Sequence, residues 1–239
     1  MKDKTTAVIL AAGQGRRMHS SVQKQYILLQ DKPVIYYALK TFQESFIDEI
    51  ILVTGNGEED FCQNEIVNKY DFSKVKKIVA GGAERYHSVA NGLKAADNGG
   101  YVFIHDGARP FLTQEILLRA YDAVKEYHAC AVGMPVKDTI KIADGNGFAK
   151  HTPDRKSLWQ IQTPQVFDME LAKEAYDRLI EKEEELKSEG INITDDAMVI
   201  ETLTRHPVKL IEGSYDNIKI TTPEDLDIAC YIIKQHIIS

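Results

Sequence analysis

Residues 5–26 read TTAVILAAGQGRRMHSSVQKQY, an apolar run that ends in two small residues and a glycine turn. Residues 7–10 form an almost continuous apolar run, which predicts a strand buried on both faces. Two arginines and a lysine follow the turn, although the whole chain carries a net charge of -7. The stretch therefore predicts a first strand with a local cluster of positive charge near its end.

Similar apolar runs alternate with helical patterns along the chain. Strands are predicted at residues 7–10, 50–53, 75–79, 101–104 and 131–136. Amphipathic helices are predicted between them, for example at residues 33–46, where Ile35, Leu39 and Phe42 share one face. Two further stripes of this kind lie within residues 85–97 and 114–127. This alternation predicts an α/β fold with a mostly parallel sheet and helices on both faces.

The pattern changes after Pro135. Residues 137–154 alternate locally around Gly145, Asn146 and Gly147, which is a hairpin turn signal. We interpret residues 137–158 as a protruding β-arm of a kind that reaches a partner subunit, and an edge hairpin of the main sheet is the alternative. Helical patterning returns at residues 169–187, and short strands are predicted at 208–213 and 217–221. A final helix is predicted after Thr222, with Asp225 reaching back to its first turn.

Length and composition indicate one globular domain. The 239 residues are 44% hydrophobic and 27% charged, as in ordinary globular proteins. The negative net charge argues against a general nucleic-acid or membrane-surface binder. The three cysteines are far apart, which predicts buried thiols in a reducing cytoplasm rather than disulfides or a zinc site. No apolar run approaches the ~18 residues of a membrane span, and the short apolar core at the start disfavours a secretory signal.

The first glycine turn does not match two common phosphate-binding motifs. The dinucleotide pattern G-x-G-x-x-G has Met18 at its third glycine position, and no G-K-[ST] of a P-loop follows. A glycine turn can still let backbone N–H groups approach a phosphate, with Arg16, Arg17 and Lys24 neutralising its charge. The alternative is a solvated basic loop, because exposed arginines are common.

Two more predicted strands end in polar or glycine residues. Gly81, Gly82 and Arg85 lie between a strand and a helix. Asp106 and Arg109 follow another strand. Ligands bind at the carboxyl ends of strands in open parallel sheets, so these segments favour a ligand site. An aspartate there is a candidate for magnesium, and a loop-capping role is its alternative.

Eight motifs in one order span nearly the whole chain: LAAGQGRRM, KQY, GGAERYHSV, HDGARPF, PVKDTIK, QTPQ, TDDA and NIKIT. This ordered set resembles the 2-C-methyl-D-erythritol 4-phosphate cytidylyltransferase family of the non-mevalonate isoprenoid pathway. The resemblance implies a Rossmann-like, glycosyltransferase-A-like nucleotidyltransferase and a homodimer formed through the β-arm. It also implies transfer of CMP from CTP to a polyol phosphate, with magnesium as cofactor.

The resemblance implies a nucleotide site at three strand ends. Its triphosphate loop would comprise Leu10, Ala11, Ala12, Gly13, Gly15, Arg17 and Lys24. Gly82 and Ser88 would contact the cytosine and ribose, with Ala83 and Arg85 nearby.

The resemblance also implies a second-substrate region. Beside the magnesium and the methylerythritol phosphate would lie Asp106, Gly107, Ala108, Arg109 and Thr163, with Asp106 as the metal ligand. Arg17 and Lys24 would stabilise charge at the α-phosphate, and Arg155 and Lys219 would hold the attacking phosphate in line. Thr139 and Arg155 would reach the partner's site. Two positions depart from the family pattern, because Gln23 replaces a usual proline and Gly107 a usual alanine.

The chemistry implied by the resemblance needs no general base. The attacking phosphate monoester is already anionic, so catalysis should consist of positioning and electrostatic stabilisation. We accordingly interpret His105 as a structural or hydrogen-bonding residue rather than a catalytic one. Two alternatives remain at this level, a ribitol-5-phosphate cytidylyltransferase and a nucleotide-binding regulator without catalysis. A nicotinamide-dependent dehydrogenase is disfavoured by the missing third glycine.

Overall fold

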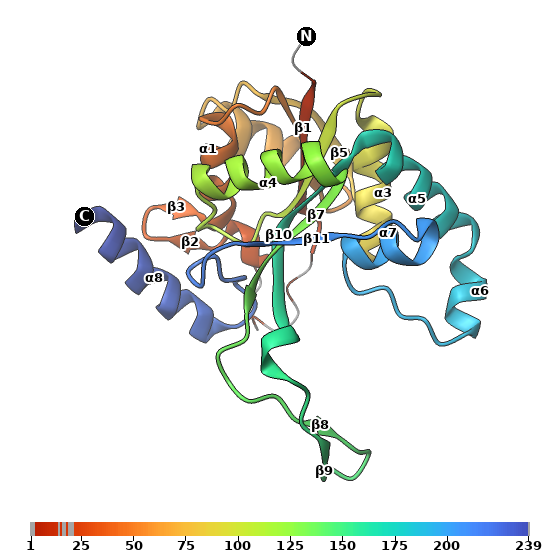
Figure 1. The fold of residues 1–239 in the computed structure, drawn as a ribbon. Helices are drawn as coiled ribbons and strands as arrows, with labels where there is room; N and C mark the ends of the chain where they lie inside the picture. Colours follow the sequence, from red (N-terminus) through yellow and green to blue (C-terminus); the bar gives the residue numbers. More distant parts are fainter. Residues whose placement is uncertain (1–2, 14, 16–17, 19–21, 239) are drawn as a thin grey trace.

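The structure is a computed structural model that describes residues 3–13, 15, 18 and 22–238. Its centre is a sheet with the strand order β11-β7-β10-β6-β1-β4-β5 (Figure 1). The strands are β1 (Thr5–Ala11), β4 (Glu49–Thr54), β5 (Val75–Ala80), β6 (Tyr101–Asp106), β7 (Ala129–Pro135), β10 (Trp159–Asp168) and β11 (Lys209–Glu212). β10 runs antiparallel to β6 and β7, and the other neighbouring pairs are parallel. The predicted mostly parallel sheet and its five predicted strands are confirmed.

Helices cover both faces of this sheet. The longer ones are α1 (Val34–Gln43), α3 (Arg85–Ala95), α4 (Gln114–Tyr127), α5 (Met169–Glu181), α7 (Asp196–Thr204) and α8 (Pro223–Ile238). The short elements are the turn η2 (Lys24–Tyr26), the hairpin strands β2 (Leu28–Leu29) and β3 (Lys32–Pro33), α2 (Glu59–Phe61) continued by η3 (Cys62–Asn68), η4 (Arg155–Ser157) and α6 (Glu183–Ser188).

The central strand β1 shows why these strands are wholly apolar. Ala7 and Ile9 pack into a core that also contains residues of α1 and α4. Val8, between them, packs into a second core with residues of α3, α5 and α7. Successive side chains of a strand point to opposite faces, so a strand covered on both faces needs apolar residues at every position.

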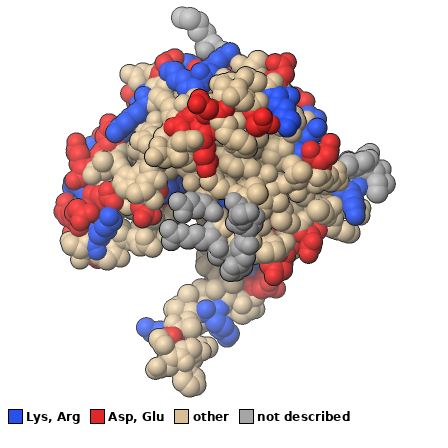
Figure 2. Space-filling model, turned by 180° about the vertical axis from the view of Figure 1, so that it is seen from behind, with Lys and Arg blue, Asp and Glu red and all other residues tan. Residues whose placement is uncertain are grey.

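The hairpin at residues 137–158 stands apart from the main sheet. β8 (Ile142–Ala143) and β9 (Ala149–His151) form a two-stranded sheet of their own, and this arm projects from the body (Figure 1). Gly147 supplies the positive φ of 86° that the turn requires. Seen from behind, the Lys and Arg side chains of the body are interspersed with Asp and Glu, and the arm extends below them (Figure 2).

Three segments differ from the expectations. The predicted strand at 217–221 is wrong, because this segment is a loop in which the buried Asn217 side chain bonds to the Thr163 carbonyl oxygen, at 2.9 Å. The helical patterning predicted at 169–187 is confirmed, but it forms two helices, α5 and α6, that divide at Lys182. β10 was not predicted, because Pro164 interrupts its pattern. The register between β10 and β7 shifts between Ile161 and Gln165, so that this proline lies within the irregularity.

The final helix begins as expected. The Asp225 carboxylate accepts hydrogen bonds from the backbone N–H groups of Thr221 and Thr222, at 2.8 and 2.9 Å. The buried face of α8, with Ala229 and Ile233, packs against Leu29 and Val34. Within the part of the chain that the structure describes, no helix combines the length and apolar character needed to cross a membrane.

Candidate active site

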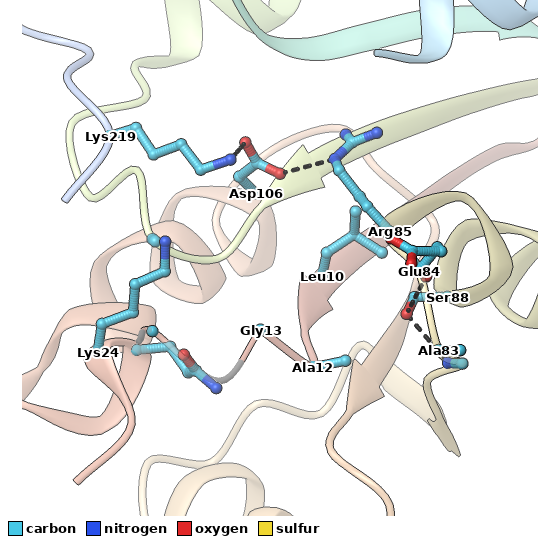
Figure 3. A pocket seen from close by; sticks show the side chains of 14 residues that line it. Leu10, Ala12, Gly13, Lys24, Ala83, Glu84, Arg85, Ser88, Asp106 and Lys219 are labelled. Carbon is cyan, nitrogen blue, oxygen red and sulfur yellow. Dashed lines mark hydrogen bonds and ion pairs between the residues drawn. The ribbon is translucent and has the colours of Figure 1, made fainter. Parts of the chain in front are cut away.

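A cleft of about 500 Å³ opens at the carboxyl ends of β1, β5 and β6 (Figure 3). Its walls come from the turn after β1, η2, the β5–α3 turn, the end of β6 and the loop before α8. The lining residues are Leu10, Ala12, Gly13, Gly15, Lys24, Gln25, Gly82, Ala83, Glu84, Arg85, Ser88, Asp106, Ala108 and Lys219. The cleft therefore lies where ligands bind in open parallel sheets.

Close contact between two strand ends forms one wall of this cleft. A Cβ on Gly81 would lie 2.4 Å from the Ala12 Cβ and 2.8 Å from the Ser88 Oγ, so only glycine fits there. The Gly82 N–H donates to the Ser88 Oγ at 3.1 Å, which ties the turn to the first helical residues of α3. Small residues and backbone thus border the cleft where the turns after β1 and β5 meet.

Asp106 lies at the centre of a cluster of positive charges. Lys219 Nζ is 2.7 Å from its Oδ2, and Arg85 Nε is 3.4 Å from its Oδ1 (Figure 3). Arg109 Nε lies 3.8 Å from Oδ2 on the buried side. Burial would raise the pKa of Asp106, but Lys219, Arg85 and Arg109 together hold that pKa well below its ordinary range. Asp196 binds Arg85 from its other side, so three cations face two carboxylates here, and the positive excess that remains suits an anionic ligand.

A buried hydrogen-bond chain supports Asp106 from behind. The backbone N–H of Asp106 donates to the Thr163 Oγ at 3.1 Å, and that Oγ lies 3.0 Å from the His105 Nδ1. The His105 Nε2 lies 3.3 Å from the Arg109 carbonyl oxygen. Burial lowers the pKa of His105 to about 4, so the ring is neutral at pH 7. His105 is therefore a hydrogen-bonding residue of the interior, with both ring nitrogens engaged away from the cleft.

The structure brings most of the sequence-derived site residues together on the cleft wall, from Leu10 to Lys219. Four others are buried rather than lining it: Ala11, Gly107, Arg109 and Thr163. Thr139 and Arg155 are exposed residues of the arm and do not line the cleft of their own chain. The Arg155 side chain donates to the Lys137 carbonyl oxygen at 2.9 Å. Arg16 and Arg17 lie outside the described residues.

Sequence reasoning missed three residues of the site. Gln25 and Glu84 line the cleft. Gln25 directly follows Lys24 and Glu84 directly precedes Arg85, so each is a sequence neighbour of a predicted site residue. Asp196 is fully buried and binds Arg85 through both carboxylate oxygens. The motif TDDA contains this aspartate, but nothing in the local pattern pairs it with an arginine 111 residues away.

Comparisons with known proteins agree with the cleft. The family model for 2-C-methyl-D-erythritol 4-phosphate cytidylyltransferase matches residues 5–235. Curated proteins of that name from Lachnoclostridium phytofermentans and Lachnospira eligens are 49% and 51% identical, over 98% and 96% of this chain and 98% and 99% of theirs. The crystal structure of 4-diphosphocytidyl-2C-methyl-D-erythritol synthase from Anaerococcus prevotii is 35% identical and superposes with a TM-score of 0.82, covering 97% of this chain and 96% of that one.

Proposed function

The chain belongs to the 2-C-methyl-D-erythritol 4-phosphate cytidylyltransferase family, and we propose that the cleft beside Asp106 is where it transfers CMP. It is a nucleotidyltransferase of isoprenoid precursor biosynthesis that transfers CMP from CTP to 2-C-methyl-D-erythritol 4-phosphate and releases pyrophosphate. The observation that supports the location is the group of cations around one carboxylate, next to the close-packed turns after β1 and β5. Such a site attracts two phosphorylated substrates and can hold them in contact.

The reaction forms one bond and breaks one bond at phosphorus. A phosphate oxygen of the polyol phosphate attacks the α-phosphorus of CTP, and the bond to the bridging oxygen of the β-phosphate breaks, so that pyrophosphate leaves. The nucleophile carries negative charge near neutral pH, so no side chain has to remove a proton. The buried, neutral His105 agrees with this scheme, because it does not line the cleft.

Lys24 and Lys219 are the cations that we assign to the phosphates. They come from η2 and from the loop before α8, and both line the cleft (Figure 3). Lys24 would stabilise the charge that develops on the α-phosphate, and Lys219 would hold the attacking phosphate in line. A fixed cation at the point where charge develops lowers the barrier without a proton transfer.

We propose Mg²⁺ as the cofactor, bound together with CTP rather than by the protein alone. Among the described residues, no group of three or more His, Cys, Asp or Glu side chains could hold a metal ion. Asp106 offers a single carboxylate, and Mg²⁺ commonly binds through one or two carboxylates plus the phosphates of a substrate. When bound there, Mg²⁺ would neutralise part of the triphosphate charge.

We further propose a homodimer in which each arm completes the partner's site. The support is that the arm projects from the body (Figure 1) and that its exposed residues Thr139 and Arg155 do not line the cleft of their own chain. Mixing Arg155→Ala with Lys24→Ala subunits tests this, because one site of a mixed dimer would then be intact. Recovery of part of the activity is expected, and no recovery despite proven subunit exchange would contradict an arm that acts in trans.

The free cysteines also lead us to propose a cytoplasmic location.

Pyrophosphate release with CTP and Mg²⁺ tests the function, with 2-C-methyl-D-erythritol 4-phosphate compared with ribitol 5-phosphate. A strong preference for the first substrate is expected from the family membership. A preference for ribitol 5-phosphate would assign a different polyol phosphate to the same cleft. CTP binding without release of pyrophosphate from either substrate would instead support the nucleotide-binding regulator without catalysis.

Lys219→Met should lower turnover by about 10²-fold. The control is Lys94→Ala, because Lys94 is an exposed lysine of α3 outside the cleft.

A further inference from the structure

A fully buried carboxylate lies behind the cleft. Asp196 is the first residue of α7, and its two side-chain oxygens accept hydrogen bonds from Nη1 and Nη2 of Arg85, each at 2.7 Å. The hydroxyl of Tyr176 donates to one of the same oxygens. Arg85 lines the cleft and Asp196 does not, so the pair joins the cleft wall to the interior. Bidentate pairs of this kind fix the plane of a guanidinium group.

Asp196 is not required to cap its own helix. The Asp195 side chain accepts the N–H of Met198 at 3.0 Å, and the Gln165 side chain accepts the N–H of Ala197. Two of the first backbone donors of α7 are therefore satisfied by side chains other than that of Asp196. A buried carboxylate is costly unless it is paired, so its presence at this position calls for a role of its own.

The pairing also decides what Arg85 can do. Both terminal nitrogens of its guanidinium are bound to Asp196, and Nε is directed at the Oδ1 of Asp106, at 3.4 Å. Burial would lower the pKa of Arg85, but Asp196 and Asp106 raise it well above its ordinary value. Arg85 is thus a permanent cation whose fork is occupied within the protein. Arg85 still lines the cleft, and the expectation that it belongs to the nucleotide-binding residues stays a prediction.

Opposite charges alternate from the interior to the cleft. Asp196 on α7 binds Arg85 on α3, Arg85 contacts Asp106 at the end of β6, and Asp106 binds Lys219 at 2.7 Å. The last member is the lysine that we assign to the attacking phosphate. Asp106 contacts Arg85 through Oδ1 and Lys219 through Oδ2, so a shift of Arg85 would change the orientation of Asp106.

We propose that Asp196 is a positioning residue for CMP transfer, which acts through Arg85 and Asp106 to hold the Lys219 ammonium in place. The proposal rests on the function proposed above. Loss of the Asp196 charge frees the Arg85 fork, which can then bind Asp106 with two nitrogens and displace Lys219. Because the affected group acts on the attacking phosphate, turnover should fall while CTP affinity is retained.

The test is Asp196→Asn, with turnover measured by pyrophosphate release. CTP affinity and stoichiometry are measured by calorimetry without Mg²⁺, because Asp106 is also the proposed Mg²⁺ ligand. We expect turnover to fall about 10- to 100-fold, the scale of a misplaced reacting group, with the Kd for CTP changed less than threefold. Asp195→Ala is the control, because it removes a cap of the same helix without touching Arg85. It should unfold at lower urea concentration, with turnover within twofold of the wild type. If it lost turnover as Asp196→Asn does, the role of Asp196 would be structural.

A double-mutant cycle tests the route through Arg85. If the proposal holds, adding Asp196→Asn to an Arg85→Gln variant lowers turnover less than twofold further, whereas independent losses that multiply would overturn it.

Should Asp196→Asn fail to fold, Arg85→Lys is the second test, because lysine keeps the charge but lacks the fork that binds both oxygens of Asp196. That variant should lose turnover at an unchanged Kd for CTP, and a tenfold rise in this Kd would show that Arg85 binds the nucleotide. Wild-type enzyme without pyrophosphate release would refute the proposed function instead.

Discussion

Acidification from pH 7 to pH 5 should weaken the fold through the protonation of His105. The ring is fully buried, and burial lowers its pKa from the ordinary 6.5 to about 4. The unfolded chain therefore binds more protons than the folded one between these two values, so the free energy of unfolding falls as the pH drops through that window. The neutral form is also the one that accepts a hydrogen bond at Nδ1 from the Thr163 hydroxyl, 3.0 Å away.

The size of the effect follows from the two pKa values. Each pKa unit corresponds to about 1.4 kcal/mol, so the whole shift is worth roughly 3 kcal/mol below pH 4 and about 2 kcal/mol at pH 5. At pH 7 both states hold the ring mostly neutral, and its contribution is close to zero. Because a domain of this kind has a total stability of only about 5–15 kcal/mol, such a loss is large enough to measure.

Urea unfolding of the wild type and of His105→Gln at pH 7, 6 and 5 measures this contribution. Glutamine lacks the titrating ring, so His105→Gln costs a constant amount of stability and removes only one source of pH dependence. We expect the difference between the two unfolding free energies to shrink by about 2 kcal/mol on going from pH 7 to pH 5. All carboxylates are common to both proteins and cancel. Curves that run parallel within about 0.5 kcal/mol would show that the ring is not held neutral, and the reasoning would fail.

Three further variants test local features of the site. Gly81→Ala places a Cβ 2.4 Å from the Ala12 Cβ, so we expect a loss of about 1–3 kcal/mol in urea unfolding. A variant as stable as the wild type would show that the two turns can separate freely. Gln23→Pro should change the free energy of unfolding by less than about 1 kcal/mol, because the φ of -62° already suits proline. A larger loss would assign a structural role to the hydrogen bonds that the Gln23 side chain makes with Glu58 and Gln25. Lys24→Ala should lower turnover by about 10²-fold, and near-normal turnover would remove Lys24 from the mechanism.

The sequence predicted the helices and strands whose hydrophobic residues recur with a regular period. In these elements the environment of each face stays the same along the element. Each parallel strand is buried on both faces, so it appears in the sequence as a short apolar run. Each helix that covers the sheet appears as a stripe of apolar residues at helical spacing. Glycine and charge at three strand ends were sufficient to predict a shared ligand site, because parallel strands end on one edge of the sheet. The cleft contains residues from all three ends.

Local pattern was insufficient where the backbone departs from a simple period. β10 carries a proline within a break in its register, and residues 217–221 alternate like a strand but form a loop. In that loop, Asn217 bonds to Thr163, and Ile220 donates to the Ala108 carbonyl oxygen at 2.9 Å. The partners that decide between strand and loop are therefore more than fifty residues away in sequence.

The sequence by itself determined the α/β class, the edge of the sheet that holds the site and most of the residues around the cleft. Only the tertiary structure decided that Thr163 supports Asp106 from behind and that the Arg85 fork faces Asp196 instead of the cleft. The physical reason is that periodicity records whether a residue is buried, not which distant group it meets. The meeting of Arg85 and Asp196 depends on how α3 and α7 pack on the same face of the sheet.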